Sequence, residues 1–140
     1  MANSWNLEPG LNHVGAYQVS GAPFATGSIN CAVDAQPMEA CIVNFPYVTR
    51  WIKVVNKDEN NPVRVGFSIS GVTGSFNFFE VGKASAANVH TDSGVLDLKV
   101  SSIVLSGSTA VDVVAGLTGI GVNRTKTSAG SNWSGSAGVG

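Results

Sequence analysis

Apolar and polar residues alternate with a period of two through the middle of the chain, as in β-strands that bury one face. Residues 48–55 and 63–70 show the alternation most clearly, and a polar loop at residues 56–62 joins them. Two such strands with a short polar connection predict an antiparallel hairpin. The residues expected on its buried face are Val48, Ile52, Val54, Val63, Val65, Phe67 and Ile69.

Segments of similar character recur along the chain, and turns rich in Gly, Ser and Asn separate them. They are residues 16–20, 39–45, 76–81, 95–100, 103–105 and 110–117. In residues 95–100, Leu96, Leu98 and Val100 are expected to face inward and the charged residues between them outward. About eight short strands predict an all-β fold, an antiparallel β-sandwich or jelly roll with extended N- and C-terminal arms.

The two ends of the chain differ from this middle part. Residues 1–38 contain no Lys or Arg and are interrupted by Gly and Pro, whereas residues 121–140 are rich in Gly and Ser. We interpret the chain as an N-terminal arm with a short strand at residues 1–38, a β-sandwich core at residues 39–120, and a Gly/Ser-rich C-terminal arm at residues 121–140.

Large apolar side chains in these arms are unusual for segments that stay in solvent, because aromatic residues dominate contact energies. We therefore expect the arms to lie on the protein's own core or on a neighbouring subunit. Trp51 is expected to pack on a sheet face or a partner rather than to stack on nucleic-acid bases. The residues predicted at such interfaces are Trp5, Leu7, Leu11, Trp51, Arg124, Lys126 and Trp133.

The composition supports a β fold and limits the partners. The chain holds 20 Val against 6 Leu, with 17 Gly and 16 Ser, which excludes a helix bundle or coiled coil. A net charge of −1 offers no field for a nucleic-acid backbone. Charged residues make up only 12%, and depletion of charge is typical of interface cores, although some small β proteins are simply neutral.

The chain shows neither a secretory signal nor an apolar stretch long enough for a membrane helix. We therefore expect synthesis in a cytoplasm and no membrane partner.

Residues with catalytic or metal-binding chemistry are few and scattered. His13 and His90 lie far apart in the sequence, and the chain has no nucleophile elbow and no phosphate-binding loop. Asp58 and Glu59 are interpreted as residues of a solvated turn, because they lie in the loop of the predicted hairpin. Their segment also lacks the Gly and the distal Glu of a calcium loop. We therefore expect no catalytic residue, no metal and no cofactor.

Cys31 and Cys41 are the two cysteines, and their spacing does not provide the two close pairs of a zinc finger. We expect two free, buried thiols. A disulfide across residues 32–40 is the alternative, which a reducing cytoplasm disfavours during folding.

Two stretches of the core, Asn44–Asn56 with Val63–Phe67 and then Leu96–Ile120, resemble small β-sandwich structural proteins of tailed bacteriophages. The likeness is to capsid cement or decoration proteins and to head-associated knob proteins. It implies a non-enzymatic virion protein, made in the host cytoplasm, that forms a homo-oligomer, with a trimer favoured. Its other partner would be the major capsid protein or another virion protein. Such families have no catalytic motif, so no residue role carries over.

A carbohydrate-binding module is the alternative function, because such modules are often β-sandwiches with exposed aromatic rings. Two of the three Trp residues lie in the end segments, whereas a flat sugar platform would place them on one sheet face. A third hypothesis, a small hydrolase that uses His90 and Asp92, is disfavoured because no nucleophile motif accompanies them.

Overall fold

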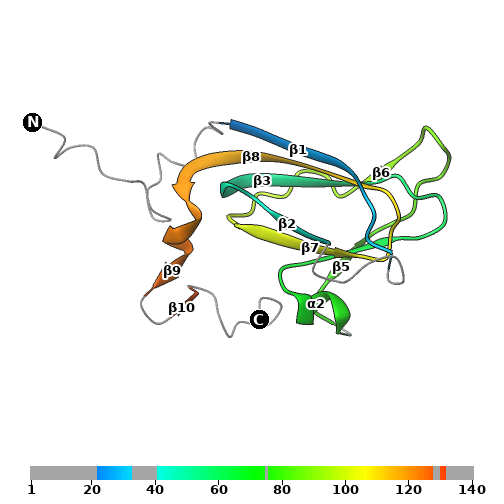
Figure 1. Cartoon of the computed structure of the whole chain (residues 1–140). Coiled ribbons are helices and arrows are strands. Elements are labelled where there is room, and N and C mark those ends of the chain that lie inside the picture. Colours follow the sequence, from blue (N-terminus) through cyan, green and yellow to red (C-terminus); the bar gives the residue numbers. More distant parts are fainter. Residues whose placement is uncertain (1–21, 33–40, 75, 128–129, 132–140) are drawn as a thin grey trace, which may run out of the picture.

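Two four-stranded antiparallel sheets pack face to face in the computed structural model, which describes residues 22–32, 41–74, 76–127 and 130–131 (Figure 1). The strand order is β1-β8-β3-β6 in the first sheet and β2-β7-β4-β5 in the second. The strands are β1 (Ala22–Ile29), β2 (Ile42–Asn44), β3 (Tyr47–Asn56), β4 (Val63–Gly66), β5 (Phe79–Val81), β6 (Thr91–Asp92), β7 (Ser102–Ser106) and β8 (Val111–Gly121). The remaining elements are the helix α2 (Ile69–Thr73), the 3-10 turn η3 (Val122–Thr125) and a small hairpin of β9 (Lys126–Thr127) and β10 (Gly130–Ser131).

This strand order is that of a jelly roll. The pairs β1–β8, β2–β7, β3–β6 and β4–β5 are successive parts of one long antiparallel hairpin whose tip lies between β4 and β5. The hairpin folds over itself, so that β8 also pairs with β3 and β7 with β4. The predicted all-β class, with about eight strands in a sandwich or jelly roll, is therefore confirmed.

The predicted hairpin between residues 48–55 and 63–70 is wrong. β3 lies in the first sheet and β4 in the second, so the polar loop between them crosses from one sheet to the other. Val63 and Val65 are fully buried, as the alternation predicted. The period identifies the buried face of each strand, but it does not identify the neighbouring strand.

The second of these predicted strands also ends earlier than expected, because the chain turns into α2. A Cβ atom at Gly66 would lie 2.6 Å from Cγ1 of Val72, so the glycine allows the helix to pack this close to β4. Val72 is consequently buried, while Ile69, predicted to face the core, is 37% exposed. The aromatic strand predicted at residues 76–81 is likewise shorter, and Phe76 is 90% exposed.

β1 lies within the segment that composition assigns to the N-terminal arm. It pairs with β8 along most of its length, and Cys31 just after it belongs to the core. The strand predicted at residues 16–20 lies outside the described residues. The sandwich therefore includes residues 22–32 in addition to the predicted core.

Residues 93–100 run beside β3 as an irregular segment rather than as the predicted strand. Leu96 exchanges two backbone hydrogen bonds with Ile52, and the hydroxyl of Thr49 donates to the carbonyl oxygen of Leu98 at 2.6 Å. Leu96, Leu98 and Val100 all pack against the core, as predicted.

A buried polar network joins three loops at one end of the sandwich. Asn56, the last residue of β3, is fully buried. Its amide nitrogen donates to the carbonyl oxygens of Asn61 at 2.9 Å and Gly82 at 3.1 Å. Its amide oxygen accepts from the hydroxyl of Ser108 at 2.8 Å and from the backbone N–H of Asp58 at 3.0 Å. One side chain therefore connects the β3–β4, β5–β6 and β7–β8 loops.

Asp58 is the charged centre of this network and is only 6% exposed. Its carboxylate accepts five hydrogen bonds, from the backbone N–H groups of Asn60, Asn61 and Thr109 and from the side chains of Asn61 and Thr109. Burial alone would raise the pKa of Asp58, but these hydrogen bonds outweigh it and hold the pKa well below its usual range. The interpretation of Asp58 as a solvated turn residue is therefore wrong.

We predict that Asp58→Asn lowers the free energy of unfolding at about pH 7 by about 2–4 kcal/mol, because the new amide NH₂ group faces N–H donors. The depressed pKa means that the carboxylate contributes its full stability above about pH 5 and loses it as the pH falls below about 4 towards the folded-state pKa. Urea denaturation should therefore show a larger acid destabilisation for the wild type than for the variant.

Glu59→Gln is the matched control, because Glu59 is the exposed neighbour in the same loop. Equal stabilities of the Asp58 and Glu59 variants at about pH 7 would contradict a structural role for the buried carboxylate.

Candidate functional site

β1 is one of the two edge strands of the first sheet, and its sequence contains no charged residue. Edge strands of soluble proteins are usually protected by Lys, Pro, bulges or covering segments, since their backbone groups can pair with another chain. β1 carries Pro23, but the exposed side chains that follow, Ala25, Gly27 and Ser28, are small and uncharged. β1 therefore presents an edge without charged side chains among the described strands.

A β-bulge interrupts the regular edge of β1 near its C-terminal end. The register between β1 and β8 shifts between Thr26 and Ile29, and Ser28 has a φ of 56°, which is rare for a residue other than glycine. The backbone N–H of Ser28 donates to Oδ1 of Asp112 at 2.9 Å, and Nζ of Lys57 lies 3.2 Å from the same oxygen. Asp112 and Lys57 thus hold the bulge in place, and the regular edge ends at Thr26.

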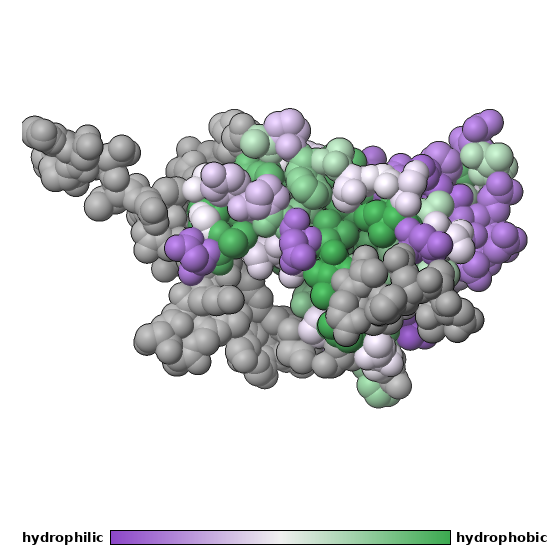
Figure 2. Space-filling model, in the orientation of Figure 1, coloured by the Kyte–Doolittle hydropathy of each residue, from purple (hydrophilic) through white to green (hydrophobic). Residues whose placement is uncertain are grey.

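A groove with both apolar and polar lining residues opens between β1 and β2, which are an edge strand of each sheet. Its volume is about 270 Å³, and it is lined by Phe24, Thr26, Ile29, Ile42, Val43 and Asn44. Figure 2 shows hydrophobic residues gathered in the middle of this view and hydrophilic residues at the end that carries the β5–β6 loop. The ring of Phe24 packs edge-on against Phe45, with centroids 5.1 Å apart, which fixes one wall of the groove.

Trp51 lies on the outer face of the first sheet, because its neighbour Ile52 points into the core. Its register partner on β8 is Gly116, and the next residue across the sheet is Pro23 on β1. The glycine leaves the half-buried indole ring of Trp51 without a side chain between it and the β1 edge. On the outer face beside β1, the indole ring of Trp51 therefore has Gly116 and Pro23 as its neighbours across the sheet.

The structure describes the side chain of one of the seven residues predicted at an interface, Trp51. Arg124 lies in η3 and Lys126 in β9, where the backbone alone is described. Trp5, Leu7, Leu11 and Trp133 lie outside the described residues. The interface role of the arms therefore stays a prediction.

β1 is not predicted from the sequence, because Pro23 and Gly27 interrupt its segment. Proline is nevertheless tolerated on an edge strand, and a glycine inside a strand can mark a bulge. The alternation of Phe24 and Thr26 with small residues was the signal that could have revealed the strand.

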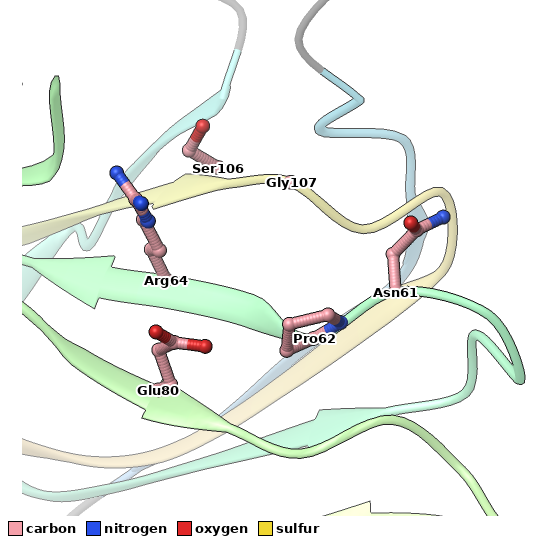
Figure 3. Close-up of a pocket in the computed structure, with 6 residues that line it drawn as sticks. All are labelled: Asn61, Pro62, Arg64, Glu80, Ser106 and Gly107. Carbon is pink, nitrogen blue, oxygen red and sulfur yellow. The ribbon is translucent and has the colours of Figure 1, made fainter.

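A second depression, of about 320 Å³, lies on the outer face of the second sheet (Figure 3). Arg64 on β4 stands between Glu80 on β5 and Ser106 on β7 in the strand register. Its guanidinium lies 4.3 Å from the centroid of the Phe78 ring. The residues that line the depression are Asn61, Pro62, Arg64, Glu80, Ser106 and Gly107. It therefore combines a cation, a carboxylate and an amide in one shallow site.

The groups considered for catalysis have separate contacts. Nε2 of His90 lies 3.3 Å from the carbonyl oxygen of Ala87, and Asp92 forms an ion pair with Lys53 at 3.7 Å. Within the described ranges, no group of three or more His, Cys, Asp and Glu residues is placed to hold a metal ion. The described part also contains no helix with the length and apolar character needed to span a membrane.

Comparisons of the chain with protein families, with curated proteins and with solved structures find no match.

We predict that Asp112→Asn loosens the β1 bulge, because the amide weakens the contacts with Ser28 and Lys57. The ion pair is about one-third exposed, so the expected loss of stability is only about 1 kcal/mol. Amide hydrogen exchange at Ser28 should accelerate more than exchange in β3. Asp97→Asn, at an exposed position beside β3, is the control, and the same acceleration in that variant would contradict the assignment.

Proposed function

We propose that this chain is a non-enzymatic structural protein of a virus particle. It would stabilise the shell as a capsid cement or decoration protein, through contacts with further copies of itself and with the major capsid protein or another virion protein. The observation that carries the proposal is the uncharged β1 edge, with the groove between β1 and β2 on one side and the Trp51 face on the other.

The physical basis is the pairing of an edge strand with a strand from another chain. Main-chain hydrogen bonds supply affinity in this mode, and side-chain pockets next to the edge supply specificity. An apolar side chain from the partner that fills the groove would contribute about 1.5–3 kcal/mol. The low charge of the chain favours such burial, because few charged groups would have to lose their hydration.

The jelly-roll topology is compatible with the same proposal but is not sufficient evidence for it. Jelly rolls occur in viral capsid proteins, but also in lectins and cupins, so the fold alone does not determine the function. The resemblance to phage structural proteins favours a homo-oligomer, with a trimer as the expected form. Localisation in the virion follows from this proposal and is part of it.

We predict that Ala25→Lys weakens assembly at least about tenfold, because a charge on the β1 edge would be buried when another strand pairs with it. Light scattering of the protein, alone and with candidate shells, measures the effect. Ala87→Lys is the control, since Ala87 is exposed in the β5–β6 loop. A wild-type protein that is strictly monomeric and binds no shell, or an Ala25→Lys variant that assembles normally, would overturn the proposal.

A carbohydrate-binding module remains the second candidate, and the depression around Arg64 is the observation that favours it. Planar polar groups such as those of Arg64, Glu80 and Asn61 suit the hydroxyl groups of a sugar, and Pro62 offers an apolar surface to its ring.

For this candidate, Arg64→Gln and Glu80→Gln should each reduce binding on a glycan array about tenfold or more, because each removes a charged hydrogen-bonding group. Ala25→Lys should leave sugar binding unchanged, which separates the two proposed functions. A wild-type protein that binds no glycan on the array would exclude this candidate.

A further inference from the structure

The two cysteines lie at equivalent places on the two sheets. Cys31 follows β1, the edge strand of the first sheet, and Cys41 precedes β2, the edge strand of the second. They are 1% and 2% exposed and belong to the same apolar core cluster. As predicted from the sequence, both are free thiols.

The thiols are neighbours, and the surrounding backbone holds them in place. The Cys41 thiol donates to the carbonyl oxygen of Asn30, the residue before Cys31, at 3.7 Å. The sulfur of Cys41 therefore lies beside the backbone that leads into Cys31. Cys31 is fixed through its backbone, which donates to the carbonyl oxygen of Ser108 at 2.7 Å and accepts from the N–H of Gly107 at 2.8 Å. The thiols are thus close together in the folded protein.

We propose that Cys31 and Cys41 are a covalent modification site, at which an intramolecular disulfide joins the edges of the two sheets under oxidising conditions. The oxidant is a small-molecule disulfide such as oxidised glutathione. The bond would close a ring that runs from residue 31 to residue 41. This inference does not depend on the proposed function, since it rests on the positions of the two thiols.

The reaction consists of two thiol–disulfide exchanges. One protein thiol loses its proton, and the thiolate attacks the small disulfide, which forms a mixed disulfide and releases one small thiolate. The second protein thiolate then attacks the protein sulfur of that mixed disulfide and releases the other small thiolate. The two cysteines are oxidised, the small disulfide is reduced to two thiols, and the two protons released by the cysteines neutralise the two small thiolates.

Burial and the neighbouring Cys41 raise the pKa of the Cys31 thiol well above its usual range. The thiolate is the attacking species, so the raised pKa slows attack by Cys31 at neutral pH, and this attack accelerates as the pH rises. A reducing cytoplasm would preserve the thiols, and an oxidising exterior would favour the disulfide. The site therefore suits a structural disulfide that forms slowly rather than a rapid redox sensor.

The test is refolding of the reduced full-length chain in a buffer of reduced and oxidised glutathione, because unfolding removes the barrier of burial. Samples are quenched with an alkylating reagent under denaturing conditions, and the mass of the intact protein is measured by mass spectrometry. The chain has only two cysteines, so a monomer that is about 2 Da lighter and unalkylated identifies the Cys31–Cys41 bond. We expect this species to predominate, with a melting temperature roughly 5–10 °C above that of the reduced protein.

Cys41→Ala serves as the control, because it should give only the alkylated protein or a glutathione adduct and show no oxidant-dependent rise in melting temperature. Predominance of free thiols, of glutathione adducts or of disulfide-linked dimers in the wild type would overturn the proposal. The wild-type mass measurement decides the question even where the variant fails to fold. Neither readout depends on assembly or sugar binding, so failure here is distinguishable from failure of the proposed function.

Discussion

The buried polar network around Asn56 and Asp58 is the constraint on which the arrangement of the sandwich depends. A buried carboxylate is costly unless hydrogen-bond donors surround it, and here the donors come from its own loop and from Thr109 in the β7–β8 loop. Those donors reach Asp58 because the chain leaves β3 and crosses to the other sheet at this end. The same residues that satisfy the charge therefore favour the crossing and disfavour a simple β3–β4 hairpin.

The two edges of the first sheet also differ. Asn56 joins three loops at one end of the sandwich, and the segment at residues 93–100 pairs along the edge of β3 through backbone and side-chain hydrogen bonds. The β1 side has no comparable cover among the described residues, apart from the bulge held by Asp112 and Lys57. The uncharged β1 edge, the groove between β1 and β2, and the indole ring of Trp51 therefore lie on the same side of the sandwich.

The alternation of apolar and polar residues predicted the buried faces of the strands better than the loop residues predicted the connections between strands. The alternation at Val63 and Val65, and again at Leu96 and Leu98, correctly identified buried faces, because a face is a local property of a strand. The hairpin failed because a short polar loop can connect strands of the same sheet or of opposite sheets. Asp58 was misinterpreted because its partner Thr109 is distant in sequence. Pro23 argued against a strand at β1, because a proline lacks the N–H group and is tolerated only where that group would face solvent at a sheet edge. Which strand lies at an edge depends on the topology, which the local sequence does not give.

The positions of the cysteines bear directly on the groove. Cys31 and Cys41 lie just beyond the ends of β1 and β2, and these two strands supply every residue that lines it. A covalent bond there would fix the spacing between the two walls, and a preformed groove loses less conformational entropy when a partner binds. Thiol chemistry and edge-strand pairing are separate proposals, but they act on the same side of the molecule. If a partner strand binds at this groove as proposed, the disulfide would strengthen that binding without adding any contact to the partner.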